Sequence, residues 1–80
     1  MNRELRGIAF SLMAQSKRCR RCIVPVTYGI AEAVVKQLSD EFEIKAIEMN
    51  SFRQSHNNRP YFHGFVTDKG GKVHARHVEV

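Results

Sequence analysis

The sequence predicts an α+β fold in the order α-β-α-β-β-β: a mixed four-stranded sheet with two helices on one face and a C-terminal β-hairpin. Two observations predict it. Residues 30–42 repeat apolar side chains with the period of a helix, and two alternating segments flank a Gly-Gly turn near the C-terminus. The length of 80 residues corresponds to one domain. We therefore expect residues 1–80 to form a single small basic α/β domain.

The first expected element is a helix that starts after Asn2 and ends near Ser16. Asparagine is a favoured N-terminal cap. One apolar face then recurs at intervals of three and four residues, through Leu5, Ile8, Ala9, Leu12 and Met13. Lys17 and Arg18 suit its C-terminal end, where the helix dipole favours cations.

Residues 22–28 are short, apolar and β-branched, which predicts a buried strand. Pro25 cannot donate a hydrogen bond to a neighbouring strand, so we expect an edge strand or a bulge.

The helix over residues 30–42 follows, with Ile30, Val34, Leu38 and Phe42 spaced four residues apart on its apolar face. We expect these side chains to pack against Ile23, Ile44, Leu5, Ile8 and Leu12.

Residues 43–49 predict a second strand, although its alternation slips at Ala46 and Ile47. A strand, a helix and a strand with short links predict a βαβ unit, in which the two strands run parallel.

Residues 50–60 are rich in Asn, Ser, Arg and His and predict a long polar loop. Loops of this length are often functional.

The C-terminal segments 61–67 and 72–80 flank Asp68-Lys69-Gly70-Gly71, which predicts a β-hairpin. Alternation along the first of these strands puts Tyr61, His63 and Phe65 on one face and Phe62, Gly64 and Val66 on the other. One set faces the helices. The other is exposed unless a second layer covers it, so it predicts a binding face or a homodimer through the sheet.

Charge is unevenly distributed along the chain, whose net charge is +5. Residues 1–29 carry +5, residues 30–50 carry −3 and residues 51–80 carry +3. The densest cluster is Lys17-Arg18-Cys19-Arg20-Arg21-Cys22. Two basic segments on one side of the fold would attract anions, phosphate groups among them.

The leading hypothesis is therefore a small cytoplasmic nucleic-acid-binding or regulatory module, binding RNA or DNA. Basic side chains would contact phosphates and an exposed aromatic would stack on bases. The residues predicted to make these contacts are Lys17, Arg18, Arg20, Arg21, Arg53, Arg59, Tyr61, Lys69, Lys72 and Arg76. Arg3, Glu4 and Arg6 interrupt the apolar stretch that a secretory signal requires, which favours the cytoplasm.

Metal binding is the weaker interpretation of the cysteines. Cys19, Cys22, His74 and His77 provide the ligand types of a structural zinc site. However, histidines three residues apart on a regular strand point to opposite faces. We expect neither metal nor cofactor.

Two alternatives remain open. The basic segment suits a protein-binding inhibitor or adaptor with an acidic partner, of the kind that phages and mobile elements encode. Four histidines lie in the C-terminal third with arginines nearby, which suits a His-dependent small ribonuclease. No nucleophile triad or paired-carboxylate motif is visible, so the sequence favours a binding protein over an enzyme and assigns no catalytic residue.

Overall fold

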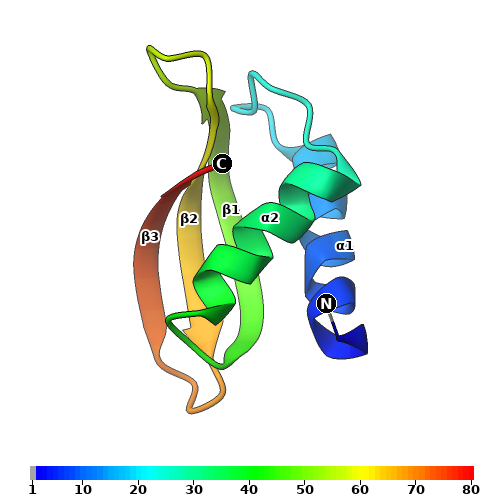
Figure 1. The fold of residues 1–80 in the computed structure, drawn as a ribbon, viewed down its shortest axis with the longest axis vertical. Coiled ribbons are helices and arrows are strands. Elements are labelled where there is room, and N and C mark those ends of the chain that lie inside the picture. The colour runs from blue at the N-terminus through cyan, green and yellow to red at the C-terminus, as the bar shows by residue number, and fades with distance from the viewer. Residues whose placement is uncertain (1) are drawn as a thin grey trace.

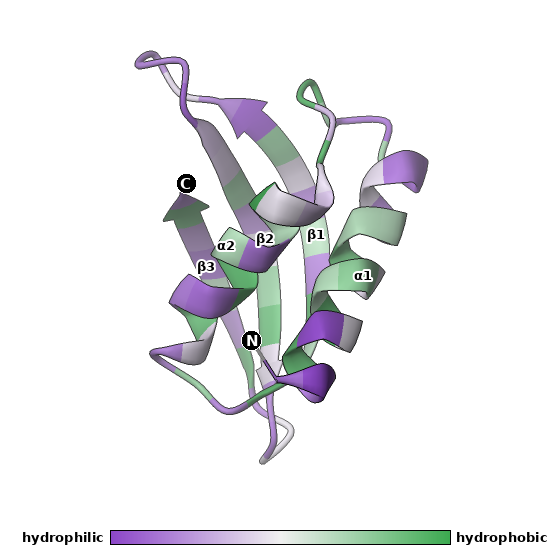
Figure 2. Ribbon diagram, turned by 45° about the vertical axis from the view of Figure 1, so that its right-hand side comes forward, coloured by the Kyte–Doolittle hydropathy of each residue, from purple (hydrophilic) through white to green (hydrophobic). Residues whose placement is uncertain are grey.

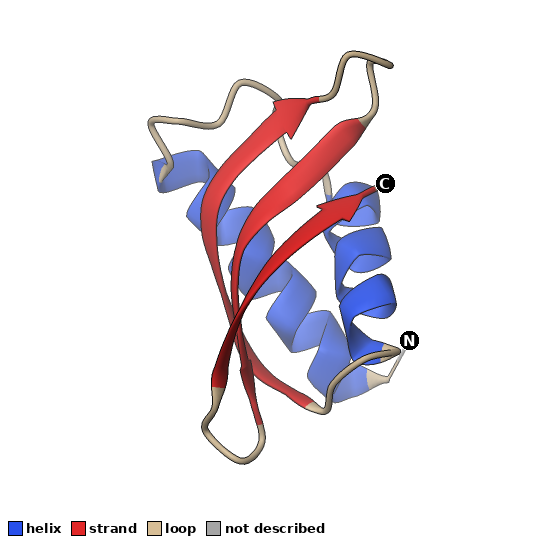
Figure 3. Cartoon of the chain, turned by 90° about the vertical axis from the view of Figure 1, so that its left-hand side faces the viewer, coloured by secondary structure: helices blue, strands red, loops and turns tan. Residues whose placement is uncertain are grey.

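A computed structural model describes residues 2–80 as two helices followed by three strands (Figure 1). The elements are α1 (Arg3–Arg18), α2 (Tyr28–Ser39), β1 (Ile44–Gln54), β2 (Pro60–Asp68) and β3 (Val73–Glu79). The strands form one antiparallel sheet in the order β1-β2-β3. Both helices pack on one face of it (Figure 3). The predicted α+β class with two helices is confirmed, whereas the fourth strand and the parallel pair are wrong.

Both helices begin with a side-chain cap. The Asn2 side chain accepts a hydrogen bond from the Leu5 amide at 2.8 Å, as predicted, and Thr27 accepts one from Ile30 at 3.3 Å. Lys17 and Arg18 occupy the last turn of α1, which continues two residues beyond the predicted end. Figure 2 shows that α1 is hydrophobic along its middle turns and hydrophilic at its two ends.

The segment predicted as the first strand is instead an irregular connection between the helices. The Ile23 and Val24 amides both donate to the carbonyl of Phe52, at 3.0 and 3.4 Å. The segment therefore bonds to β1 through this one carbonyl and forms no strand ladder. Pro25 has no amide hydrogen to donate, and Thr27 is already the N-cap of α2. Ile23 was predicted to pack in the core, but its side chain is 70% exposed, so that prediction is wrong.

The predicted long loop is mostly strand. β1 continues to Gln54 and β2 begins at Pro60, which leaves a five-residue connection, residues 55–59. It closes through the Ser55 amide, which donates to the carbonyl of Arg59 at 2.8 Å. Asn58 adopts a left-handed conformation with φ of 59°, which asparagine tolerates. β1 and β2 therefore form an antiparallel hairpin, and no βαβ crossover is present among residues 2–80.

The core lies between the helices and the inner face of the sheet. Of the predicted core residues, Ile8, Leu12, Val34, Leu38 and Ile44 are buried, while Leu5, Ile30 and Phe42 pack at its margin. Phe52 and Phe62 are fully buried and face each other in register across β1 and β2. The inner face of the sheet is thus filled, and no helix within residues 2–80 covers the outer face.

The edge of β1 that does not pair with β2 is covered by α1 and the segment after it, whose side chains and amides bond to its backbone. Gln15 donates to the carbonyl of Ile47 at 2.8 Å and accepts from the amide of Met49 at 2.9 Å. Its amide group thereby takes the place of a neighbouring strand. The Cys19 thiol meets the carbonyl of Asn50 at 3.5 Å, and the Phe52 carbonyl lies next along the edge.

Gly64 allows β1 and β2 to approach closely, which gives a test of the fold. A methyl group there would overlap the carbonyl oxygen of Glu48 and lie 2.7 Å from the Phe62 ring and 3.0 Å from the Met49 Cα. We expect Gly64→Ala to lower the free energy of unfolding by about 1–3 kcal/mol, as overpacking does. Urea denaturation followed by circular dichroism measures the change.

Gly7→Ala is the matched control. Gly7 lies within α1 and a methyl group there meets nothing within 4 Å. Because alanine favours a helix over glycine, this variant should gain about 1 kcal/mol. Equal effects at the two positions would contradict the close approach of β1 and β2 at Gly64.

Candidate functional site on the outer face of the sheet

The outer face of the sheet, the face turned away from the helices, carries the aromatic residues of β2 that alternation predicts. Tyr61, His63 and Phe65 are on this face, while Phe62 and Val66 are buried beneath the helices. Phe65 is 36% exposed. The predicted division of this strand is confirmed.

The strand register groups the outer-face side chains into rows. Arg53, Tyr61 and Glu79 lie opposite one another on β1, β2 and β3. The next row is Ser51, His63 and His77, and the one after it is Glu48, Phe65 and Ala75. Direct cross-strand neighbours have Cβ atoms about 4.5–5.5 Å apart, so side chains within each row are in reach of one another.

A bulge in β1 adds a polar side chain to this face. The register slips between Met49 and Ser51, which leaves Asn50 without a partner on β2. Met49 and Phe52 are buried under the helices, and Asn50 and Ser51 between them both line the outer face. Bulges often re-aim side chains beside functional sites, and here two adjacent residues reach the same side.

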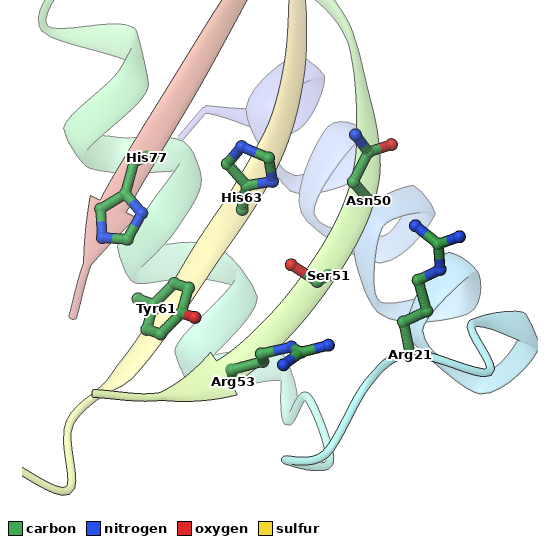
Figure 4. A pocket seen from close by; sticks show the side chains of 7 residues that line it. All are labelled: Arg21, Asn50, Ser51, Arg53, Tyr61, His63 and His77. Carbon is green, nitrogen blue, oxygen red and sulfur yellow. The ribbon is translucent and has the colours of Figure 1, made fainter. Parts of the chain in front are cut away.

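These rows line a hollow of about 380 Å³ at the end of the sheet nearest the C-terminus of α1. We call it the outer-face hollow. Figure 4 shows its basic side chains on the β1 side and an aromatic pair on the β3 side, with an imidazole between them. The lining residues are Arg21, Asn50, Ser51, Arg53, Tyr61, His63 and His77.

The aromatic pair is formed by Tyr61 and His77. Their rings stack with centroids 4.5 Å apart and an interplanar angle of 28°. Tyr61 is half-buried and His77 is exposed, so the stack is open to solvent on one side. A flat group such as a nucleobase finds a preformed ring surface there.

Arg21 reaches the hollow because the segment after α1 is held against β1. The Cys22 amide donates to the carbonyl of Cys19 at 3.5 Å, which makes a tight turn around Arg20 and Arg21. The Ile23 amide then holds the chain to β1. Two arginines from distant parts of the sequence, Arg21 and Arg53, are thereby brought to one side of the hollow (Figure 4).

The structure divides the ten residues predicted to bind nucleic acid. Seven come from segments at the end of the fold where α1 stops and β1 meets β2 (Figure 1): Lys17, Arg18, Arg20, Arg21, Arg53, Arg59 and Tyr61. Lys69 and Lys72 lie in the β2–β3 turn at the opposite end, where Lys69 pairs with Glu4. Arg76 lies on the helix side, where it bonds Glu41 at 2.9 Å and covers the Phe42 ring at 5.0 Å.

Four residues of the hollow lie outside the ten that the sequence predicted to bind nucleic acid: Asn50, Ser51, His63 and His77, of which His77 was named only as a candidate zinc ligand. Strand alternation does place His63 on the same face as Tyr61, so the sequence could have predicted His63 as a residue of this site. His77 depends on the hairpin register, which the turn with Gly71 at φ 86° sets. A slip of one residue would have turned His77 to the other face.

The four candidate zinc ligands do not converge. His77 is on the outer face, while His74 stacks on Phe42 at 4.3 Å on the helix side and bonds Asp68 at 3.0 Å. The two histidines thus diverge as the sequence predicted. Across residues 2–80, no three His, Cys, Asp or Glu side chains gather as metal ligands would.

The two cysteines are free thiols in different environments. A hydrogen bond from the Cys22 thiol is the main reason why the pKa of Cys19 lies below its ordinary value. Burial and the neighbouring Cys19 raise the pKa of Cys22 to about 11. Since the thiolate is the nucleophile, Cys19 is the more reactive of the two.

This difference predicts selective alkylation. Near pH 8, about half a unit below the ordinary thiol pKa, iodoacetamide should modify Cys19 first and leave Cys22 until the protein unfolds. Mass spectrometry of timed digests measures both rates. Cys22→Ala should slow the reaction of Cys19, because the donor that stabilises its thiolate is removed, and equal rates in the unaltered protein would contradict the assignment.

Comparison of the chain with protein-family models, with curated proteins and with solved structures returned no match. None of the helices within residues 2–80 is long and apolar enough to cross a membrane.

Proposed function

We propose that this protein binds single-stranded nucleic acid, RNA in particular, across the outer face of its sheet. The observation that carries the proposal is the outer-face hollow, where Arg21 and Arg53 lie across from the stacked Tyr61 and His77. Guanidinium groups bind phosphates and aromatic rings stack on unpaired bases. Side chains for both kinds of contact line the same hollow.

A single strand suits this surface better than a duplex does. Bases within a duplex are stacked on each other, so their faces cannot reach an aromatic side chain on a sheet. Asn50 and Ser51 supply hydrogen-bond donors and acceptors at the same place, and a ribose 2′-hydroxyl uses both. This favours RNA over DNA as the ligand.

The basic cluster at the end of α1 extends the phosphate path beyond the hollow. Lys17, Arg18 and Arg20 are exposed there, next to Arg21 in sequence. A strand that crosses the hollow toward α1 would pass these cations. We also propose that the protein acts in the cytoplasm as a regulatory RNA-binding module.

Salt dependence tests the binding of phosphates. Arg21→Ala combined with Arg53→Ala should weaken binding to a fluorescent single-stranded RNA, measured by anisotropy. The slope of log affinity against log salt should flatten by about 0.7 for each phosphate that the variant no longer neutralises. Lys69→Ala combined with Lys72→Ala removes the same charge at the opposite end and should change the slope little. If the unaltered protein binds no nucleic acid at low salt, the proposal fails.

Stacking is tested at Tyr61. Removal of one stacked aromatic costs about 1–3 kcal/mol of binding, so Tyr61→Ala should weaken RNA binding by that amount at fixed salt. Tyr61→Phe keeps the ring and should bind nearly as well as the unaltered protein. Titration of both variants under the same buffer separates ring stacking from the hydroxyl, and equal weakening in the two would argue against stacking.

A second candidate is an inhibitor or adaptor that binds an acidic protein. Phe10, on α1, is 52% exposed and stacks on Tyr28 of α2 with ring centroids 4.5 Å apart. This apolar spot lies on the layer of helices and not on the sheet. Phe10→Ala should abolish binding to such a partner and leave RNA binding intact.

A homodimer through the outer face would compete with RNA, because it would cover the hollow. Phe65 and Val73 supply exposed apolar surface on that face. Sedimentation with and without RNA distinguishes the two arrangements, since RNA binding would dissociate such a dimer.

A further inference from the structure

We infer that the outer-face hollow also cleaves the RNA it binds, with His63 and His77 as the pair that transfers protons. This inference rests on the proposed function, because it requires RNA in the same hollow.

The two histidines are direct cross-strand partners. His63 on β2 lies opposite His77 on β3, so their Cβ atoms are about 4.5–5.5 Å apart. Both are exposed and line the hollow together (Figure 4). Two imidazoles that start this close can contact one phosphate group from two sides.

The surroundings of the pair suit a reacting phosphate. Arg53 and Tyr61 lie in the adjacent row, and Arg21 approaches from the segment after α1. The arginines can stabilise the negative charge that builds on the phosphate oxygens. Glu79 lies opposite Tyr61 and Glu48 opposite Phe65, so the charged groups near the pair are these two carboxylates and the two arginines.

The other histidines have different surroundings. His74 is on the helix side, bonded to Asp68 and stacked on Phe42. His56 lies in the β1–β2 connection and does not line the hollow. His56 therefore serves as the control position.

The reaction is an internal transfer at phosphorus. One imidazole, neutral, takes the proton from the ribose 2′-hydroxyl as its oxygen bonds to the adjacent phosphorus. The bond from phosphorus to the 5′-oxygen of the next nucleotide breaks, and the other imidazole, protonated, gives that oxygen a proton. The products are a 2′,3′-cyclic phosphate and a 5′-hydroxyl. One proton is taken and one is given, and no oxidant or further reactant is needed.

The first experiment uses a labelled single-stranded RNA and its all-2′-deoxy counterpart. The protein should cut the RNA, leave a 2′,3′-cyclic phosphate end identifiable by mass spectrometry, and leave the deoxy strand intact. His63→Phe and His77→Phe keep a ring for stacking but remove the nitrogens that carry protons. Each should lower the cleavage rate about 10²–10⁴-fold while RNA binding, measured by anisotropy, persists. His56→Phe should cut like the unaltered protein.

The second experiment assigns the roles with uridine 3′-(4-nitrophenyl phosphate). Its nitrophenolate leaves without a proton, so the variant that lacks the acid should keep its activity on this ester and the variant that lacks the base should lose it. The profile of cleavage rate against pH should be bell-shaped for RNA, and each single variant should lose one limb of it. His63→Asn and His77→Asn repeat the test should a phenylalanine variant fold poorly by circular dichroism.

The outcomes separate the two proposals. RNA that is bound but not cut would overturn the cleavage inference and leave the proposed function in place. Cleavage that survives when His63→Phe and His77→Phe are combined, or that also cuts the deoxy strand, would overturn the assignment to His63 and His77. If RNA is not bound at all, both proposals fail.

Discussion

Hydrogen bonds from α1 and the segment after it to the outer edge of β1 hold the helices and the sheet together. Gln15 bonds the backbone of β1 on both sides of Glu48, and the Ile23 amide bonds it again at Phe52. These bonds satisfy backbone groups that an open edge would leave to water or to another chain. They end the sheet at three strands. They also hold the turn that carries Arg21 beside the hollow, so one set of contacts completes the fold and shapes the site.

Each face of the sheet carries an arginine and a histidine, but these side chains have different partners on the two faces. On the helix side, Arg76 is engaged by Glu41 and Phe42, and His74 by Asp68 and Phe42. A carboxyl bonded to an imidazole and to backbone amides keeps its negative charge more easily, and the pKa of Asp68 is accordingly lowered. These groups stabilise the packing of β3. Their counterparts on the outer face are Arg53 and His77. No helix within residues 2–80 lies above these two side chains, so they remain available to a ligand.

Binding and cleavage would use the same hollow, but cleavage would require more precise placement of its side chains. In the proposed function, the stacked rings and arginines would bind any strand with phosphates and unpaired bases, and such binding requires little precision in their placement. Proton transfer would require two imidazoles on either side of one phosphorus, and the strand register makes His63 and His77 direct cross-strand partners. The acidic Glu48 and Glu79 flank the hollow and limit its positive potential. Moderate affinity would let cleaved products leave.

Sequence periodicity identified both helices and the two faces of β2. Apolar spacing located both helices and most of the core, the Asn2 cap was correct, and alternation separated Tyr61, His63 and Phe65 from the buried side of β2. The cluster of cations at residues 17–21 was evident from composition. These features depend on contacts between residues close in the chain, which sequence periodicity records directly.

Tertiary structure decided which segments pair and where the site forms. Residues 22–28 have the composition of a strand, but the donorless Pro25 and the cap at Thr27 leave them as a connection held by the Phe52 carbonyl. Residues 50–54 look like a loop, yet pairing with β2 extends β1 through them with a bulge at Asn50. The hollow joins Arg21, Arg53, His63 and His77 from four separate segments. Their meeting depends on strand register and edge closure, and neither leaves a periodic signal in the chain, because both are settled by long-range backbone hydrogen bonds.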